Sequence, residues 1–195
     1  MTAPAVIETE RLILRPWAES DREPFVAMMA EPETGYWLGG VLGRAEADVA
    51  FDRMRAFLDE NGHGYWAAVV KADGGFVGRI CVRRMPMEWE HPFSGQVEVG
   101  WGLARRAWGH GYASEGAAAL LAWGFATLGV AEIFSFTADT NARSEAVMRR
   151  LGLTRAPDRD FDHPALAHDH PLRSHIVYVA HPPSPSRGGK SDPRT

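Results

Sequence analysis

Apolar and polar positions alternate most regularly over residues 97–103, and this period of two predicts a half-buried strand. One face of the strand carries only apolar side chains: Val97, Val99, Trp101 and Leu103. The other face carries Glu98 followed by two glycines, so it has one carboxylate and almost no side-chain bulk. Because a bare strand face allows close approach to the backbone, we expect an extended molecule to lie against it.

The same alternation predicts further strands, while apolar positions three and four residues apart predict helices. The strands are expected over residues 6–14, 65–71, 76–83, 133–138 and 175–180, and the long helices over 44–60, 112–128 and 141–151. A shorter helix should start at Ser20, with Glu23 completing a capping box, and end before Pro32. The fold class is α/β (α+β), a single domain with a central, mostly antiparallel mixed sheet of about seven strands and about four helices.

Length and composition place the chain among ordinary globular proteins. Its 195 residues suit one domain, expected over 1–181, followed by a disordered Pro-, Ser- and Gly-rich tail over 182–195. A net charge of -4 argues against broad nucleic-acid binding, and the single Cys81 excludes an internal disulfide. The sequence has no apolar run of membrane-spanning length and no signal core, so we expect a cytoplasmic protein without membrane partners.

A basic glycine turn follows the strand over 97–103 and leads into the helix that starts near Tyr112. Gly109 and Gly111 allow backbone conformations that other residues resist, and the first turn of a helix exposes amide hydrogens that have no partner. With Arg105 and Arg106 adding positive charge, this turn suits a phosphate. An extended amide-rich arm beside a pyrophosphate is the chemistry of coenzyme A, so the sequence predicts a coenzyme A site.

The run Arg106-Ala107-Trp108-Gly109-His110-Gly111 resembles the Arg/Gln-x-x-Gly-x-Gly/Ala loop of the GNAT superfamily of acetyl-CoA-dependent N-acetyltransferases. The longer run of Glu98–Leu103 followed by Trp108–Glu115, together with Thr9–Pro16 and Asn141–Leu153, is similar to the branch that contains the ribosomal-protein-alanine N-acetyltransferases. The resemblance implies that the strands over 97–103 and 133–138 splay apart to admit acetyl-CoA. Homodimers are common in this branch, and no feature of the sequence fixes the oligomeric state.

The resemblance and the turn together imply a set of residues that bind acetyl-CoA, with no metal. Asn141 and Leu103 are expected beside the pantetheine arm, and the backbone of the turn beside the pyrophosphate. The expected cofactor-binding residues are Leu103, Arg105, Arg106, Ala107, Gly109, His110, Gly111, Tyr112, Ala113, Asn141 and Ser144.

Acetyl transfer to an amine needs a proton acceptor for the amine and stabilisation of the departing thiolate. Glu98 is the candidate acceptor, directly or through water; the alternative is a carboxylate that only holds a neighbouring strand or an arginine. Ser144 is the candidate for the thiolate, because residues 141–151 contain no tyrosine of the kind that many GNAT enzymes use there. The alternative for Ser144 is helix capping or hydrogen bonding to its own backbone.

The function that fits this pattern is transfer of acetyl from acetyl-CoA to a primary amine, of a small molecule or a protein N-terminus, by direct attack in a ternary complex. A non-catalytic acyl-CoA-binding module on the same fold is the alternative. A kinase or nucleotide hydrolase would need a Gly-x-x-x-x-Gly-Lys-Ser/Thr loop, which does not follow the strand.

The acceptor pocket is expected from three loops that carry rings or charges. The first is a glycine-rich loop over 33–43 that contains Tyr36 and Trp37. The second contains Trp89 to His91, and the third spans residues 158–173. The two rings at 36 and 37 either line a substrate entrance or only cover the core. The segment 158–175 is rich in His and Asp, and we expect a solvated loop or a rim for an amine rather than a metal site. Its acids, with Asp59 and Glu60, could attract a cationic amine.

Overall fold

The computed structural model describes residues 4–87 and 91–182, and one mixed sheet runs through this part of the chain. The strand order is β1-β2-β3-β4-β5-β6-β9-β7, and β8 also pairs with β9. The bounds are β1 Ile7–Glu8, β2 Leu12–Arg15, β3 Gly64–Val70, β4 Phe76–Arg84, β5 Val97–Leu103, β6 Ile133–Ala138, β7 Thr154–Arg155, β8 Phe161–Asp162 and β9 Ser174–Ala180.

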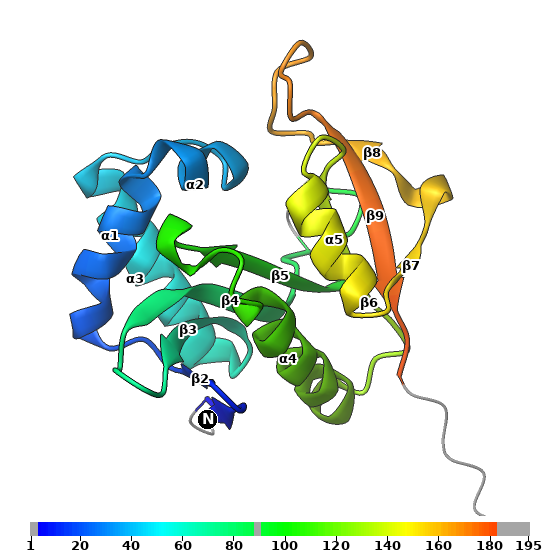
Figure 1. Cartoon of the computed structure of the whole chain (residues 1–195). Helices are drawn as coiled ribbons and strands as arrows, with labels where there is room; N and C mark the ends of the chain where they lie inside the picture. Colours follow the sequence, from blue (N-terminus) through cyan, green and yellow to red (C-terminus); the bar gives the residue numbers. More distant parts are fainter. Residues whose placement is uncertain (1–3, 88–90, 183–195) are drawn as a thin grey trace, which may run out of the picture.

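Helices cover both faces of this sheet (Figure 1). Their bounds are α1 Arg22–Ala30, α2 Pro32–Trp37, α3 Arg44–Asn61, α4 Tyr112–Leu128 and α5 Ala142–Arg150, with short 3-10 turns at Glu19–Asp21, Arg105–Ala107 and Pro157–Arg159. Helix α4 packs closely on β4 because two of its contact positions are glycines. Gly116 lies against Ile80, and Gly124 against Val82. On the opposite face, Trp17 joins Phe25 of α1 to Phe51 of α3 by edge-on ring contacts.

The sheet is split between β5 and β6. These two strands run parallel and pair in register at Glu98 and Phe134, whereas β4 and β5 pair along seven positions, from Gly78–Leu103 to Arg84–Val97. Beyond Glu98 the strands diverge, so the edge of β5 from Val99 to Leu103 faces a gap (Figure 1). The splayed strands that the family resemblance implied are therefore confirmed, and the other strand pairs of the described chain are antiparallel.

Several predicted elements differ in detail from the structure. The described chain has nine strands rather than seven, because two-residue strands such as β7 and β8 add to β9 and are too short to leave a pattern in the sequence. The predicted loop over 33–43 begins with α2, which starts at Pro32 as the first helical residue. The capping box of Ser20 is wrong, since Asp21 accepts the backbone N–H of Ala18 instead.

Two expectations fall partly or wholly on residues outside the described ranges. Residues 183–195 of the predicted tail lie outside them, as does Trp89 of the predicted acceptor pocket. Within the described residues, no helix combines the length and the apolar character needed to cross a membrane.

The β4–β5 pairing predicts a severe effect of Gly78→Ala. Gly78 has φ +146°, and an added Cβ would overlap the carbonyl oxygen of Gly102 and lie 2.7 Å from Cα of Leu103, both backbone atoms of the paired strand. We expect a loss of about 4 kcal/mol and a Tm lower by about 10 °C. The control Gly129→Ala also has positive φ, +60°, but open space around it, and should lose about 1–2 kcal/mol. Equal losses in thermal unfolding would show that the strand contact is not the cause.

Candidate active site

The strand register assigns the side chains of β4 and β5 to two faces of the sheet. Ile80 and Val82 face α4, so Trp101 and Val99, which pair with them, face α4 as well. The opposite face carries the three cross-strand pairs Arg79–Gly102, Cys81–Gly100 and Arg83–Glu98, together with Tyr65 from β3. A groove of about 1220 Å³ reaches both faces through the β5–β6 split.

The glycines of β5 do not leave a bare face, which corrects the sequence interpretation. A Cβ at Gly102 would lie 2.9 Å from Cδ1 of Leu38, and one at Gly100 would lie 3.2 Å from Sγ of Cys81. These glycines therefore let Leu38 and Cys81 pack against the strand. What the split leaves accessible is the edge of β5, where its backbone N–H and C=O groups can pair with an extended ligand.

The glycine turn presents backbone amides at the start of α4. Gly109 and Gly111 have φ of +80° and +82°, and Gly111 is the N-cap residue of the helix. Within the described chain, the backbone amides from Gly109 to Ser114 donate no hydrogen bond. Gly109, Gly111, Tyr112 and Ala113 line the groove. Unpartnered amides and the positive end of the helix dipole together favour an anion at this position.

An ion pair that the sequence reasoning missed anchors this turn. Nε and Nη2 of Arg11 contact Oε2 of Glu115, at 2.7 and 2.6 Å, and Nη1 of Arg11 donates to the carbonyl oxygen of His110 at 3.0 Å. The backbone N–H of Arg11 also donates to Glu115. Arg11 belongs to the predicted motif Thr9–Pro16, but its partner is more than one hundred residues away in the sequence, so no local pattern reveals the contact.

Some of the predicted cofactor-binding residues of the turn line the groove, and others do not. Arg106 donates from Nη2 to the carbonyl oxygen of Phe76, and the ring of His110 stacks on Tyr112. Neither residue lines the groove, whereas Arg105, Ala107 and Leu103 do. The Arg105 guanidinium pairs with Glu33, and its backbone N–H donates to Glu31.

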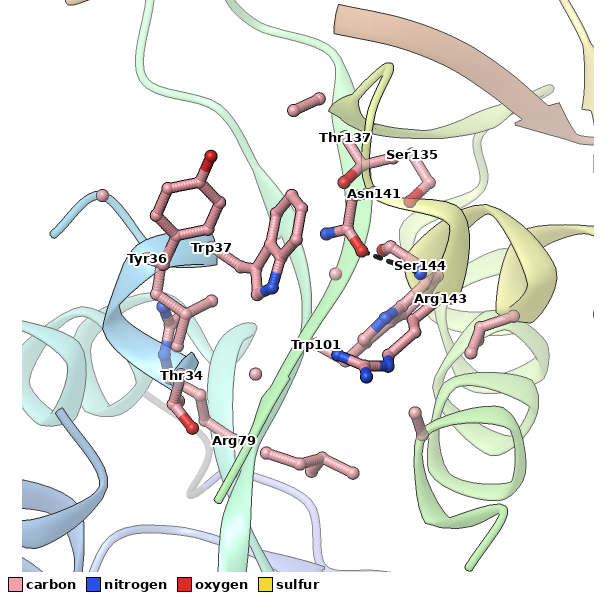
Figure 2. Close-up of a pocket in the computed structure, with 18 of the residues that line it drawn as sticks. Thr34, Tyr36, Trp37, Arg79, Trp101, Ser135, Thr137, Asn141, Arg143 and Ser144 are labelled. Atoms are coloured by element: carbon pink, nitrogen blue, oxygen red, sulfur yellow. Dashed lines mark hydrogen bonds between the residues drawn. The ribbon is translucent and has the colours of Figure 1, made fainter. Parts of the chain in front are cut away.

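Asn141 and Ser144 lie together on the α5 side of the groove (Figure 2). Oδ1 of Asn141 accepts the backbone N–H of Ser144 at 3.2 Å, so Asn141 is the N-cap residue of α5. The amide nitrogen of Asn141 and the hydroxyl of Ser144 take part in no hydrogen bond within the described residues. Capping therefore leaves both polar groups available to a ligand.

Glu98 lies at the pairing point of β5 and β6 in a buried ion pair. It is 6% exposed, and its Oε1 atom accepts from Nε of Arg83, which is 9% exposed, at 2.5 Å. Burial disfavours the Arg83 cation, but Tyr65, Glu98 and Cys81 outweigh this effect, and the pKa of Arg83 is raised above its usual value. Burial raises the pKa of both Cys81 and Tyr65 to about 12, so both are neutral at physiological pH. Glu98 therefore holds an arginine, which was the alternative role expected from the sequence. Its carboxylate also lines the groove.

The groove is basic. Among the described residues that line it, the only carboxylate is that of Glu98, against five arginines: Arg79, Arg83, Arg105, Arg143 and Arg150. The acids that were expected to attract a cationic amine therefore do not line the groove. Asp162 pairs with Arg173, and the other acids named for that role, Asp59, Glu60, Asp160 and Asp169, also lie outside the lining.

The His-rich segment folds against an aromatic cluster at one end of the groove. The ring of His163 lies 5.1 Å from that of His175 and 5.7 Å from that of His91, with Phe136 and Phe161 beside them. Burial, followed by the nearby His175 and His91, lowers the pKa of His163 to about 4. Burial also lowers the pKa values of His91 and His175. His163, His170 and His175 line the groove, as expected for a rim. Within the described residues, no group of His, Cys, Asp or Glu is arranged to hold a metal ion.

Comparison with known proteins relates the chain to acetyltransferases. The model of the acetyltransferase (GNAT) domain matches residues 11–154. The FsC-acetyl coenzyme A-N(2)-transacetylase of Aspergillus fumigatus is 31% identical over 160 residues, which cover 78% of this chain but only 66% of that protein, so about one third of its length lies outside the match.

Solved structures share the fold over nearly the whole chain. An acetyltransferase of Agrobacterium tumefaciens is 29% identical with a TM-score of 0.74, covering 93% of this chain and 97% of that one. A GNAT-family acetyltransferase of Bacillus anthracis, at 22% identity and a TM-score of 0.71, covers 91% and 98% and supports the fold alone.

The histidine cluster predicts a loss of stability in acid. Because folding favours neutral His163, the unfolded chain binds more protons between pH 6.5 and 4, and the stabilisation present above pH 6.5 is lost as pH falls. The full shift would correspond to about 3 kcal/mol, which partial exposure reduces to about 1 kcal/mol. We expect the fall in Tm from pH 7.5 to 4.5 to be about 3 °C smaller in His163→Phe. In His168→Phe, at an exposed site of the same segment, Tm should fall as much as in the wild type. If Tm of His163→Phe also falls as much as in the wild type, His163 is not the source of the acid sensitivity.

Proposed function

The chain belongs to the GNAT family of acetyltransferases and is an acetyl-CoA-dependent N-acetyltransferase, and on this premise we propose that it acetylates a primary amine by direct attack in a ternary complex. The observation that carries the proposal is the split between β5 and β6, which opens a strand edge beside the unpartnered amides at the start of α4. The acceptor is a small molecule or a protein N-terminus. The relative from Aspergillus fumigatus is named for acetyl transfer from acetyl coenzyme A to an N(2) nitrogen, which agrees with an amine acceptor.

The described residues fit acetyl-CoA, which supplies the acetyl group as a thioester. The edge of β5 up to Leu103, with Asn141 across the groove, would hold the amide-rich arm. The amides from Gly109 to Ala113 would hold the pyrophosphate, and Arg143 and Arg150 add positive charge on the α5 side. Figure 2 shows Arg143 beside Ser144 on this side.

Glu98 and Ser144 then have separate tasks in the transfer. The amine nitrogen bonds to the acetyl carbon while the carbon–sulfur bond breaks, and the proton that nitrogen loses balances the one that sulfur gains. Glu98 takes the amine proton, directly or through water, on Oε2, which accepts no hydrogen bond within the described residues. Ser144 donates its hydroxyl hydrogen bond to the sulfur as negative charge develops there.

The cofactor assignment predicts that a carboxylate in the turn blocks acetyl-CoA. Ala113→Asp places a negative charge in the first turn of α4, where it stabilises the helix but repels the pyrophosphate. We expect the Kd for acetyl-CoA, measured by isothermal titration calorimetry, to rise at least tenfold. Ala118→Asp introduces the same charge at an exposed position of α4 and should stay within twofold of the wild type. An unchanged Kd in Ala113→Asp would place the pyrophosphate elsewhere.

The base assignment predicts a rate effect that is separable from stability. We expect Glu98→Gln to lower kcat about 100-fold and to leave acetyl-CoA affinity unchanged. Ser144→Ala should lower kcat about tenfold.

Because Glu98→Gln also leaves Arg83 buried without its carboxylate, the double variant Arg83→Gln/Glu98→Gln is the control. It should recover Tm relative to Glu98→Gln but not kcat. If kcat recovers along with Tm, or if Glu98→Gln and Ser144→Ala leave kcat unchanged, the residues are structural only.

A further inference from the structure

Arg79 lines the groove, and within the part of the chain that the structure describes it has no anionic partner. It is partly buried on β4, and its Nε atom covers Gly102 of β5, 3.6 Å from where a Cβ would stand. Its guanidinium carbon lies 4.5 Å from the ring centroid of Tyr65. Within the described residues the Arg79 side chain forms no hydrogen bond or ion pair, and its Nε is buried without an acceptor.

The other groove arginines differ from Arg79 in partner or in place. Arg83 pairs with Glu98, Arg105 pairs with Glu33, and Arg150 donates to the hydroxyl of Ser114. Arg143 stacks on Trp108 of the glycine turn, close to the amides that suit the pyrophosphate. An arginine that is partly desolvated and lacks an acceptor is costly, so its geometry indicates a ligand anion.

This anion lies on the acceptor side of the sheet. Arg79 projects from the face opposite α4, whereas the turn and its amides lead into α4 itself. The same face carries Glu98 at the pairing point of the split. The guanidiniums of Arg79 and Arg83 both contact the ring of Tyr65, so they lie within about 10 Å of each other. Arg79 is therefore within reach of a small molecule whose amine is beside Glu98.

Apolar side chains form the walls of this part of the groove. Tyr36, Trp37 and Leu38 come from the α2 end of the chain, and Phe136, Leu166 and Leu172 from the other side of the groove. Figure 2 shows Tyr36, Trp37 and Arg79 on the same side, opposite Asn141 and Ser144. On this face the groove therefore offers the guanidinium of Arg79, the ion pair of Arg83 with Glu98, and walls that include aromatic and aliphatic side chains.

We propose that Arg79 binds a carboxylate of the acceptor, and that the acceptor is an amino acid with an apolar side chain. The proposal rests on the proposed function and names its substrate class. The guanidinium is a planar fork that binds a carboxylate in two parallel hydrogen bonds, which fixes the orientation of the molecule and so the position of its amine. An amine without a carboxylate leaves Arg79 unpaired in the ternary complex, and this is the source of selectivity.

The test compares each of the twenty L-amino acids with its C-terminal amide as acceptor, by release of coenzyme A thiol from acetyl-CoA with the full chain. We expect apolar amino acids to have kcat/KM at least tenfold above their amides. Arg79→Gln should lower kcat/KM for the acids about 10- to 100-fold, mainly through KM, and change the amides less than twofold. Arg79→Lys should recover part of the loss. Arg84→Gln, at an exposed site of the same strand, should match the wild type.

Calorimetry supplies the readouts that do not depend on turnover. Acetyl-CoA should bind Arg79→Gln and wild type alike, and N-acetyl-L-phenylalanine should bind wild type more tightly than its amide does. If acetyl-CoA does not bind the wild type, the proposed function fails. If it binds but no amino acid is acetylated, or acids and amides react alike, the acceptor assignment alone is overturned. A raised acetyl-CoA Kd in Arg79→Gln would assign Arg79 to the carrier and overturn it as well.

Discussion

The parallel contact between β5 and β6 at Glu98 and Phe134 is the point on which the groove depends. Strands that continued in register would close the sheet and satisfy their backbone groups with each other. Within the described residues the edge of β5 from Val99 to Gly102 has no paired strand along the groove, while the carbonyl of Leu103 accepts from Nε1 of Trp108. A buried strand edge without partners is unfavourable. A ligand that carries amide groups in an extended chain satisfies such an edge. The pantetheine arm of coenzyme A has this form, so the split and the carrier explain each other.

The ion pair of Glu98 and Arg83 holds this point in place. Both side chains are almost fully buried, and a buried ion pair gains little net stability over apolar residues of the same size. Its retention here is better explained by position: it fixes a carboxylate at the end of the groove and ties β4 to β5 where β5 leaves β6. Structural and catalytic roles for Glu98 are therefore compatible, because the arginine occupies one carboxylate oxygen and the reaction requires only the other.

Local patterns predicted the parts of the site that are local in the sequence. Alternation identified the strand over 97–103, and the glycine turn and the Asn141 cap lie within a few residues of the groups that they organise. The sequence interpretation of Gly100 and Gly102 was wrong because the atoms that fill the space above them, from Leu38 and Cys81, belong to other elements. The Arg11–Glu115 pair, the partner of Glu98 and the histidine cluster depend in the same way on sheet register between distant segments.

The distribution of charge follows from the two faces of the sheet. The chain has a net charge of -4, yet arginines outnumber carboxylates among the described residues that line the groove. Asp160 and Asp162 of the 158–175 segment pair with Arg155 and Arg173, which do not line the groove. Cations at the glycine turn and α5 match the phosphates of the carrier. The phosphates of the carrier do not explain the charge of Arg79, because Arg79 lies on the opposite face of the sheet from the glycine turn, next to the aromatic walls. Within the described residues this charge has no anionic partner, and the carboxylate proposed for the acceptor would supply one, so under the proposal the two faces divide the recognition of the carrier from the recognition of the acceptor.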